Sequence, residues 1–84
     1  MAQHTSEQSD QSVLEKIEGL VHEEQHLYGK GDLSDHDQVR LGKLQVELDQ
    51  CWDLLRQRRA RREFGQDPDA AKVRPASVVE GYEQ

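Results

Sequence analysis

The chain is short of the residues that build a large hydrophobic core. Its 84 residues include one Cys, one Trp and one Phe, and Leu, Ile, Val and Phe together number 18. That share, about a fifth, is close to the level below which chains stay unfolded. We therefore expect one small domain, marginally stable as a monomer, that self-associates or binds a partner.

Other absences exclude whole classes of protein. A single Cys rules out an internal disulfide and fits a reducing cytoplasm. The stretch MAQHTSEQSDQS has neither a basic start nor an apolar run, so we expect no signal peptide. No apolar stretch approaches the about 18 residues that cross a bilayer. The sequence predicts a cytoplasmic protein with no membrane contact and no cofactor.

Charge is distributed unevenly along the chain. Residues 1–55 hold 12 acidic and 4 basic side chains, residues 56–62 hold five Arg and no acid, and residues 63–84 hold five acids and two bases. The acidic body repels phosphates and disfavours broad nucleic-acid binding. The Arg cluster has three interpretations: cations that complement a helix C-terminus, a dock for an acidic protein surface, or a contact with RNA.

The first half of the chain predicts one amphipathic helix over about residues 12–29, after a disordered segment 1–11. Ser12 followed by Glu15 is typical of a capping box at a helix start. Gly29 begins a turn-forming stretch that ends the helix. The apolar positions between them recur at spacings of three and four, on one helical face: Val13, Leu14, Ile17, Leu20, Val21, Leu27 and Tyr28.

A second helix is predicted over about residues 35–64. Ser34 and Asp37 begin it, and Phe64 and Gly65 end it. Its apolar stripe comprises Leu41, Leu44, Leu48, Cys51, Trp52 and Leu55. We expect Cys51 to be buried and unreactive. The short connection predicts an all-α fold over residues 12–64, an antiparallel, coiled-coil-like two-helix hairpin.

The second helix is expected to outlast the first. Folding the chain about Gly31 sets Ile17 near Leu48, so the first helix ends opposite about residue 53, and about ten residues of the second helix remain. The tail, a second copy or another protein must cover them. The residues expected to bind a partner are Trp52, Leu55, Arg56, Arg58, Arg59, Arg61 and Arg62.

Residues 65–84 form a tail with its own signals. Asp67 before Pro68 predicts a turn or short helix over 68–72, and the residues before Pro75 should be extended. The apolar side chains after them would pack on the second helix or on a partner: Val78, Val79 and Tyr82. The alternative is a disordered acidic tail.

The sequence HEEQH at His22–His26 matches the zinc-protease pattern H-E-x-x-H, and Asp32 stands where a third ligand would stand. In such a site Glu23 would activate water. The chain, however, has no predicted strand beside the motif and too few residues for a two-lobed cleft. We therefore expect boundary histidines and no catalytic residue, with His22, His26 and Asp32 as the only metal candidates.

Three blocks of the sequence carry a resemblance: ELDQCWDLLRQRRARREFG, DPDAAKVRP and VVEGYEQ. The chain resembles a family of small, uncharacterised actinobacterial proteins with a domain of unknown function. The resemblance implies a bacterial cytoplasmic protein and brings no activity, ligand or catalytic residue with it. It also implies that the tail belongs to the folded unit.

These observations predict a non-catalytic helical interaction module. The module would dock on a protein partner, or on a second copy as a homodimer, through the apolar stripe and the Arg cluster of its second helix. The alternative prediction is an RNA- or ribosome-associated accessory protein that uses the cluster Arg56–Arg62.

Overall fold

The structure, a computed structural model, describes residues 9–80, and the regular secondary structure in that range is entirely helical. The all-α class is thereby confirmed. The expected disorder of residues 1–8 and the expected packing of Tyr82 lie outside the described residues. The chain forms α1 (Asp10–Tyr28), α2 (Asp35–Glu63), a 3-10 turn η1 (Pro68–Ala70) and α3 (Ala76–Glu80).

Helix α1 begins two residues earlier than expected because Ser9, and not Ser12, is its N-cap. The Ser9 hydroxyl accepts a hydrogen bond from the Ser12 backbone N–H at 3.1 Å, and the Ser12 hydroxyl donates to the Ser9 carbonyl at 2.9 Å. Asp10 therefore lies in the first turn, where a carboxylate is favoured by the helix dipole. Residues 9–11, expected to be disordered, belong to the helical unit.

Helix α2 begins with the capping box that the sequence indicates. The Ser34 hydroxyl accepts from the Asp37 N–H at 3.0 Å, and the Asp37 carboxylate accepts from the Ser34 N–H at 3.2 Å. Lys30 from the preceding turn also donates to Asp37, at 2.9 Å. The chain turns at Gly31, whose φ of +86° favours glycine.

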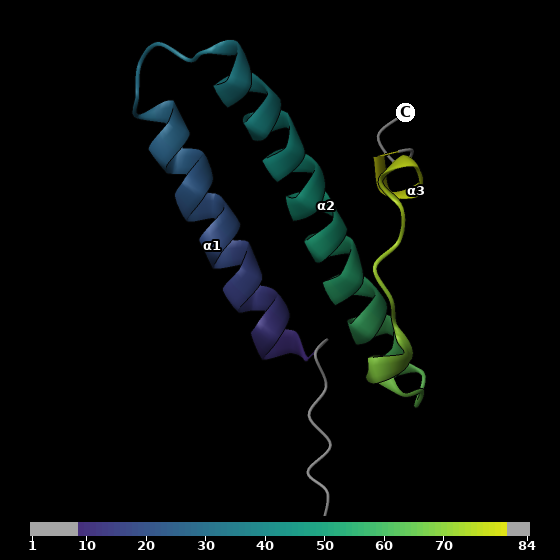
Figure 1. The fold of residues 1–84 in the computed structure, drawn as a ribbon. Helices are drawn as coiled ribbons and strands as arrows, with labels where there is room; N and C mark the ends of the chain where they lie inside the picture. The colour runs from purple at the N-terminus through teal and green to yellow at the C-terminus, as the bar shows by residue number, and fades with distance from the viewer. Residues whose placement is uncertain (1–8, 81–84) are drawn as a thin grey trace, which may run out of the picture.

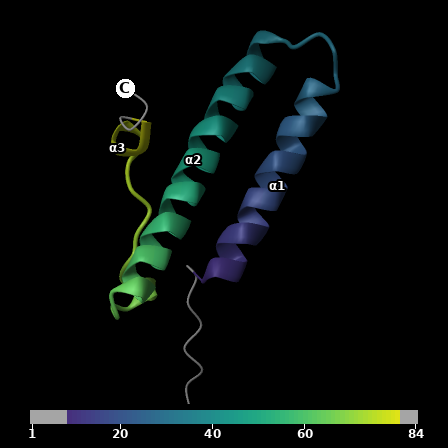
Figure 2. The ribbon, with the colours of Figure 1, turned by 180° about the vertical axis from the view of Figure 1, so that it is seen from behind.

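Helices α1 and α2 lie side by side and bury their apolar stripes against each other (Figure 1; Figure 2). Leu44 is fully buried, and the expected burial of Cys51 is confirmed. The buried seam comprises Val13, Ile17, Leu20, Leu27, Leu41, Leu44, Leu48, Cys51 and Leu54. Trp52, assigned by the sequence to the same stripe, is instead 45% exposed.

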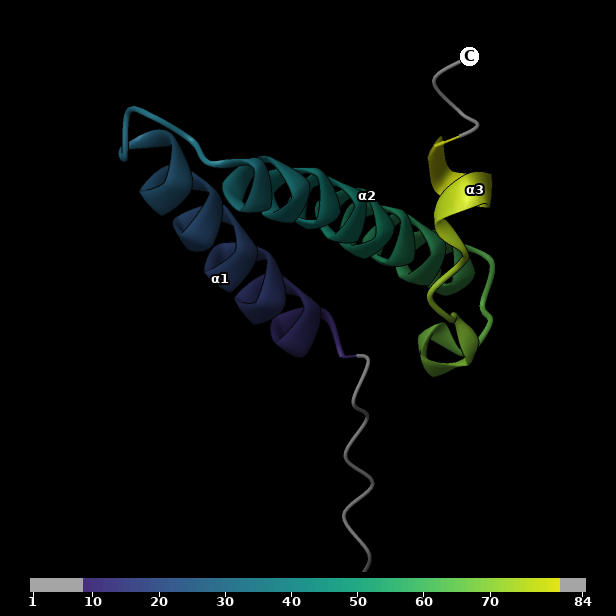
Figure 3. The ribbon, with the colours of Figure 1, turned by 45° about the horizontal axis from the view of Figure 1, so that its top comes forward.

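Helix α2 is the central element of the fold. It packs against α1 on one side and against η1 and α3 on another (Figure 1; Figure 3). The principal extents, 50 × 35 × 16 Å, are those of a flat molecule. Since one helix with its side chains is about 10 Å across, the molecule is little more than one layer of helices thick.

Ion pairs at both ends show how α1 lies along α2. Glu23, near the end of α1, binds Arg40, near the start of α2, and Asp10, at the start of α1, binds Arg58 and Arg62. The contacts of α1 therefore extend past residue 53, where α1 was expected to run out. The tail covers part of what remains.

We predict that Leu44→Ala lowers the free energy of unfolding by about 2–5 kcal/mol, because it opens a cavity at a fully buried position. The matched control is Val39→Ala on the same helix, where the side chain is 58% exposed, and its effect should stay within about 0.5 kcal/mol. Urea unfolding followed by circular dichroism measures both. Equal effects would contradict the assigned seam.

Candidate interaction surface

The tail is attached to α2 through a buried carboxylate. Asp53 is 1% exposed, and both its oxygens accept from Arg74 of the tail, with Arg74 Nε 2.9 Å from Oδ2. Gln57, one turn along α2, donates to the same Oδ2 at 2.9 Å. The hydrogen bonds from Arg74 and then Gln57 lower the pKa of the Asp53 carboxyl despite its burial.

Two glutamines of α2 bind the tail backbone. Gln57 Nε2 donates to the Lys72 carbonyl at 2.9 Å, and Gln50 Nε2 donates to the Arg74 carbonyl at 3.1 Å. No helix forms between residues 71 and 75, so these carbonyls have no helical partner. The glutamines supply hydrogen bonds that the backbone of this segment lacks.

Arg58 joins three parts of the chain. It is 4% exposed, and its Nε donates to Asp10 of α1 at 2.5 Å, while Nη1 donates to Asp69 at 3.0 Å and to the Pro68 carbonyl at 3.2 Å. Arg62 adds a second ion pair to Asp10, at 2.9 Å. Hydrogen bonds from Arg62 and then Arg58 lower the pKa of Asp10.

The tail thus covers one side of the C-terminal half of α2. Leu54 is 2% exposed, Ala71 of the tail 1% and Val79 of α3 4%. Val79 packs inward as expected, while Val78 on the same short helix is 44% exposed. Of the three covers that the sequence left open for the second helix, the tail occupies this side.

Most of the residues predicted to bind a partner remain at the surface of α2, next to the side that the tail covers. Trp52, Leu55, Arg56 and Arg59 line one shallow hollow, in which Leu55 is half-buried and the two Arg are exposed. Arg61 is half-buried and Arg62 exposed. Arg58 is the exception, because burial and its partners remove it from the surface.

Gln45, seven residues before Trp52 and so on the same stripe of α2, reaches a side chain of α1. Gln45 Nε2 lies 3.4 Å from the Tyr28 hydroxyl, so the stripe of α2 that contains Gln45 borders the stripe of α1 that contains Tyr28. Residues seven apart share a stripe, which adds Leu14 and Val21 on α1. We call this side the open face: Leu14, Val21, Tyr28, Gln45, Asp49, Trp52, Leu55, Arg56 and Arg59.

The opposite side of the same helix pair carries an ion-pair network. Arg40 donates from Nε and Nη2 to both oxygens of Glu23, at 2.7 and 2.9 Å, and its Nη1 lies 3.9 Å from Glu47. These side chains bridge α1 and α2 with charge. The open face carries exposed apolar side chains, with Leu14 42% and Tyr28 58% exposed.

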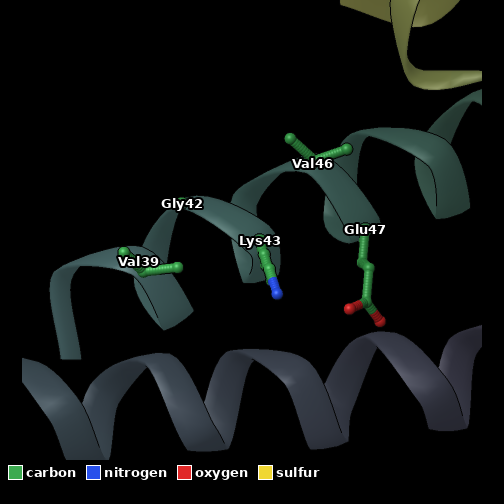
Figure 4. A pocket seen from close by; sticks show the side chains of 5 residues that line it. All are labelled: Val39, Gly42, Lys43, Val46 and Glu47. Carbon is green, nitrogen blue, oxygen red and sulfur yellow. The ribbon is translucent and has the colours of Figure 1, made fainter. Parts of the chain in front are cut away.

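A second hollow lies on the N-terminal half of α2 (Figure 4). In the close-up Val46 points away from α1, while the carboxylate of Glu47 points toward it. The lining comprises Val39, Gly42, Lys43, Val46 and Glu47. The charged groups of this hollow are the ammonium group of Lys43 and the carboxylate of Glu47, and its apolar side chains are two valines. These groups do not form the arrangement of nucleophile, base and oxyanion donors that an active site needs.

The H-E-x-x-H motif lies at the surface. His22 and His26 are exposed, and Asp32 is exposed in the turn after α1. Glu23 is occupied by Arg40, whose hydrogen bonds lower the pKa of its carboxyl. Within residues 9–80, no three His, Cys, Asp or Glu side chains lie close enough together to hold a metal ion.

Sequence reasoning missed the ion pairs of Asp10 with Arg58 and Arg62. It also missed the polar residues that join the tail to α2: Gln50, Asp53, Gln57 and Arg74. Helical spacing offers one signal, because Gln50, Asp53 and Gln57 recur at three and four residues and so line one side of α2. Arg74 carried no local signal, since its partner lies 21 residues away.

The fold and the surface define a class of protein: small and all-α, with a tail held to α2 by hydrogen bonds and ion pairs, and with an open face that carries apolar and cationic side chains. The chain belongs to the family described as protein of unknown function (DUF2630), whose model matches residues 9–84. It is 50% identical over 78 residues to uncharacterized proteins of Mycobacterium bovis and Mycobacterium tuberculosis, covering 88% of this chain and 90% of each relative. The resemblance to an uncharacterised actinobacterial family is thus confirmed.

No solved structure matches the chain significantly. Among the described residues, none of the helices combines the length and the apolar character needed to cross a membrane.

We predict that Arg74→Ala lowers the free energy of unfolding by about 2 kcal/mol, because it leaves a buried carboxylate without its charged partner. Arg59→Ala is the control, since the Arg59 side chain is 77% exposed and its removal should cost less than about 0.5 kcal/mol. Urea unfolding gives both values. An Arg74 variant as stable as the Arg59 variant would show that the pairing of Arg74 with Asp53 contributes nothing to the free energy of unfolding.

The free energy of unfolding should also depend on pH through the carboxyl groups of Asp10 and Asp53. Both carboxyls have a lowered pKa in the folded chain, so their contribution is complete above the unfolded value of about 3.9 and disappears as the pH falls through the folded values. Urea midpoints should therefore decline below about pH 4. In Asp10→Asn/Asp53→Asn the midpoint should be lower at neutral pH and fall less steeply; an unchanged slope would contradict these assignments.

Proposed function

We propose that the protein is a non-catalytic helical interaction module: an antiparallel helix hairpin that docks on another protein chain through its open face. The observation that carries the proposal is the grouping of Trp52, Leu55, Arg56 and Arg59 around one hollow on α2. Trp and Arg are the residues most enriched among those that dominate binding energy at protein interfaces. We propose the cytoplasm as its compartment, consistent with a single, buried Cys.

A further feature supports docking on a protein. The open face holds apolar side chains from both helices, and within residues 9–80 Leu14, Tyr28 and Trp52 remain exposed there. Stable domains bury such faces between two packed layers. A partner that supplies the second layer would satisfy this constraint.

A catalytic function has less support than a binding function from the described residues. Cys51 is buried, and that burial raises the pKa of its thiol, which disfavours the thiolate needed for attack. The histidines of the H-E-x-x-H motif have no third ligand gathered beside them within residues 9–80. A binding role is therefore the stronger proposal.

Nucleic-acid contact through Arg56–Arg62 is the second candidate. It is less favoured because two of the five guanidinium groups, those of Arg58 and Arg62, are bound to Asp10. Fewer cations remain for phosphates, and acidic side chains surround them. RNA binding would be steeply salt-dependent and would need Arg56, Arg59 and Arg61.

A pull-down from the native host tests the docking proposal. Tagged wild-type chain should retain a defined set of proteins, counting an untagged copy of itself, and Trp52→Gln/Arg56→Gln should retain at least about tenfold less. Lys43→Gln on another side of α2 is the matched control and should bind as wild type does. Identical sets for all three chains would refute docking through the open face, and loss of the set on ribonuclease treatment would favour RNA contact.

A further inference from the structure

The open face is the strongest unassigned feature of the molecule. The second hollow, at Val39–Glu47, has nothing in the structure to indicate its occupant, and Cys51 is buried without a partner group. The open face, by contrast, combines apolar side chains with charges of both signs in a regular order. That order gives information about what covers it.

The stripe of α2 on the open face has a two-fold pattern. Gln45, Asp49, Trp52, Arg56 and Arg59 follow one another at spacings of four, three, four and three residues, the spacing by which helices pack along a seam. Trp52 stands near the middle of this stripe. Asp49 lies three residues before it and Arg56 four residues after it, so opposite charges flank the aromatic ring at nearly equal distances.

We infer that the partner at the open face is a second copy of this chain, related by a two-fold axis that passes near Trp52. This inference rests on the proposed function. In such a dimer the two α2 helices cross antiparallel, the Trp52 rings meet at the centre, and Asp49 of each copy faces Arg56 of the other. An isologous contact needs this self-complementarity, because each residue and its partner exchange places across the axis.

The remaining positions agree with the same axis. Gln45 of one copy lies level with Arg59 of the other, which places an amide and no second cation opposite that guanidinium. Leu14 and Leu55 add apolar area near the centre; Leu14 is 42% exposed and Leu55 half-buried in the single chain. The pairing turns one layer of helices into two, with a shared apolar centre.

A charge exchange tests the dimer. The wild-type chain should sediment at twice 9.7 kDa at high concentration, and Asp49→Arg or Arg56→Asp alone should weaken the dimer at least about tenfold, because each places like charges opposite one another. The double variant Asp49→Arg/Arg56→Asp restores opposite pairing and should dimerise nearly as tightly as wild type. Lys43→Asp, a charge reversal on another side of α2, should leave the dimer unchanged.

Trp52, the only Trp, reports on the same contact. Its emission should move to shorter wavelength and become less accessible to acrylamide as concentration rises in the wild type and the double variant. Circular dichroism of every variant separates loss of dimer from loss of fold. A wild-type chain that stays at 9.7 kDa, or a folded double variant that stays monomeric, overturns the inference. If host proteins are still captured through Trp52 and Arg56 in that case, the proposed function stands without it.

Discussion

A buried guanidinium needs carboxylates and carbonyls close by, and the fold depends on how Arg58 obtains them. Asp10 comes from the start of α1, and Asp69 with the Pro68 carbonyl comes from the tail. Each of these partners would be lost if α1 slid along α2 or the tail detached. Removing one partner of a buried ion pair costs far more than the pair contributes. Arg58 therefore fixes the positions of α1 and of the tail on α2.

The sequence predicted what short-range rules determine. The α2 start at Ser34, the turn near Gly31 and the α1–α2 seam follow from capping, glycine and periodicity. Sequence reasoning placed the α1 start at Ser12 because Ser12 and Glu15 fit a capping box, whereas the N-cap in the structure is Ser9. It missed α3, whose five residues are too few to show a period, and the pairing of Asp53 with Arg74, because a contact across 21 residues leaves no local pattern. Sequence reasoning grouped Arg58 with the surface cations because its partners, Asp10 and Asp69, lie 48 and 11 residues away in the chain.

The packing of the tail determines which sides of α2 remain exposed. With one side of α2 covered by η1 and α3, Leu14, Tyr28 and Trp52 remain exposed on the open face, on the other side of the helix pair from the network of Arg40 with Glu23 and Glu47. We propose that such a chain, with few large apolar residues, is marginally stable alone and gains stability from a second layer.

Hydrogen exchange of the tail amides tests the central claim, that residues 68–80 are an integral part of the fold. The N–H groups of Ala71, Val78 and Val79 are hydrogen-bonded to the carbonyls of Pro68 and Pro75. These amides should be protected, and Ala71 and Val79, which lie against α2, should exchange with the same opening free energy as the amides around Leu54. Exchange of the tail at the rate of an unfolded chain, while the α1–α2 seam stays protected, would contradict the clamped fold and the open face derived from it.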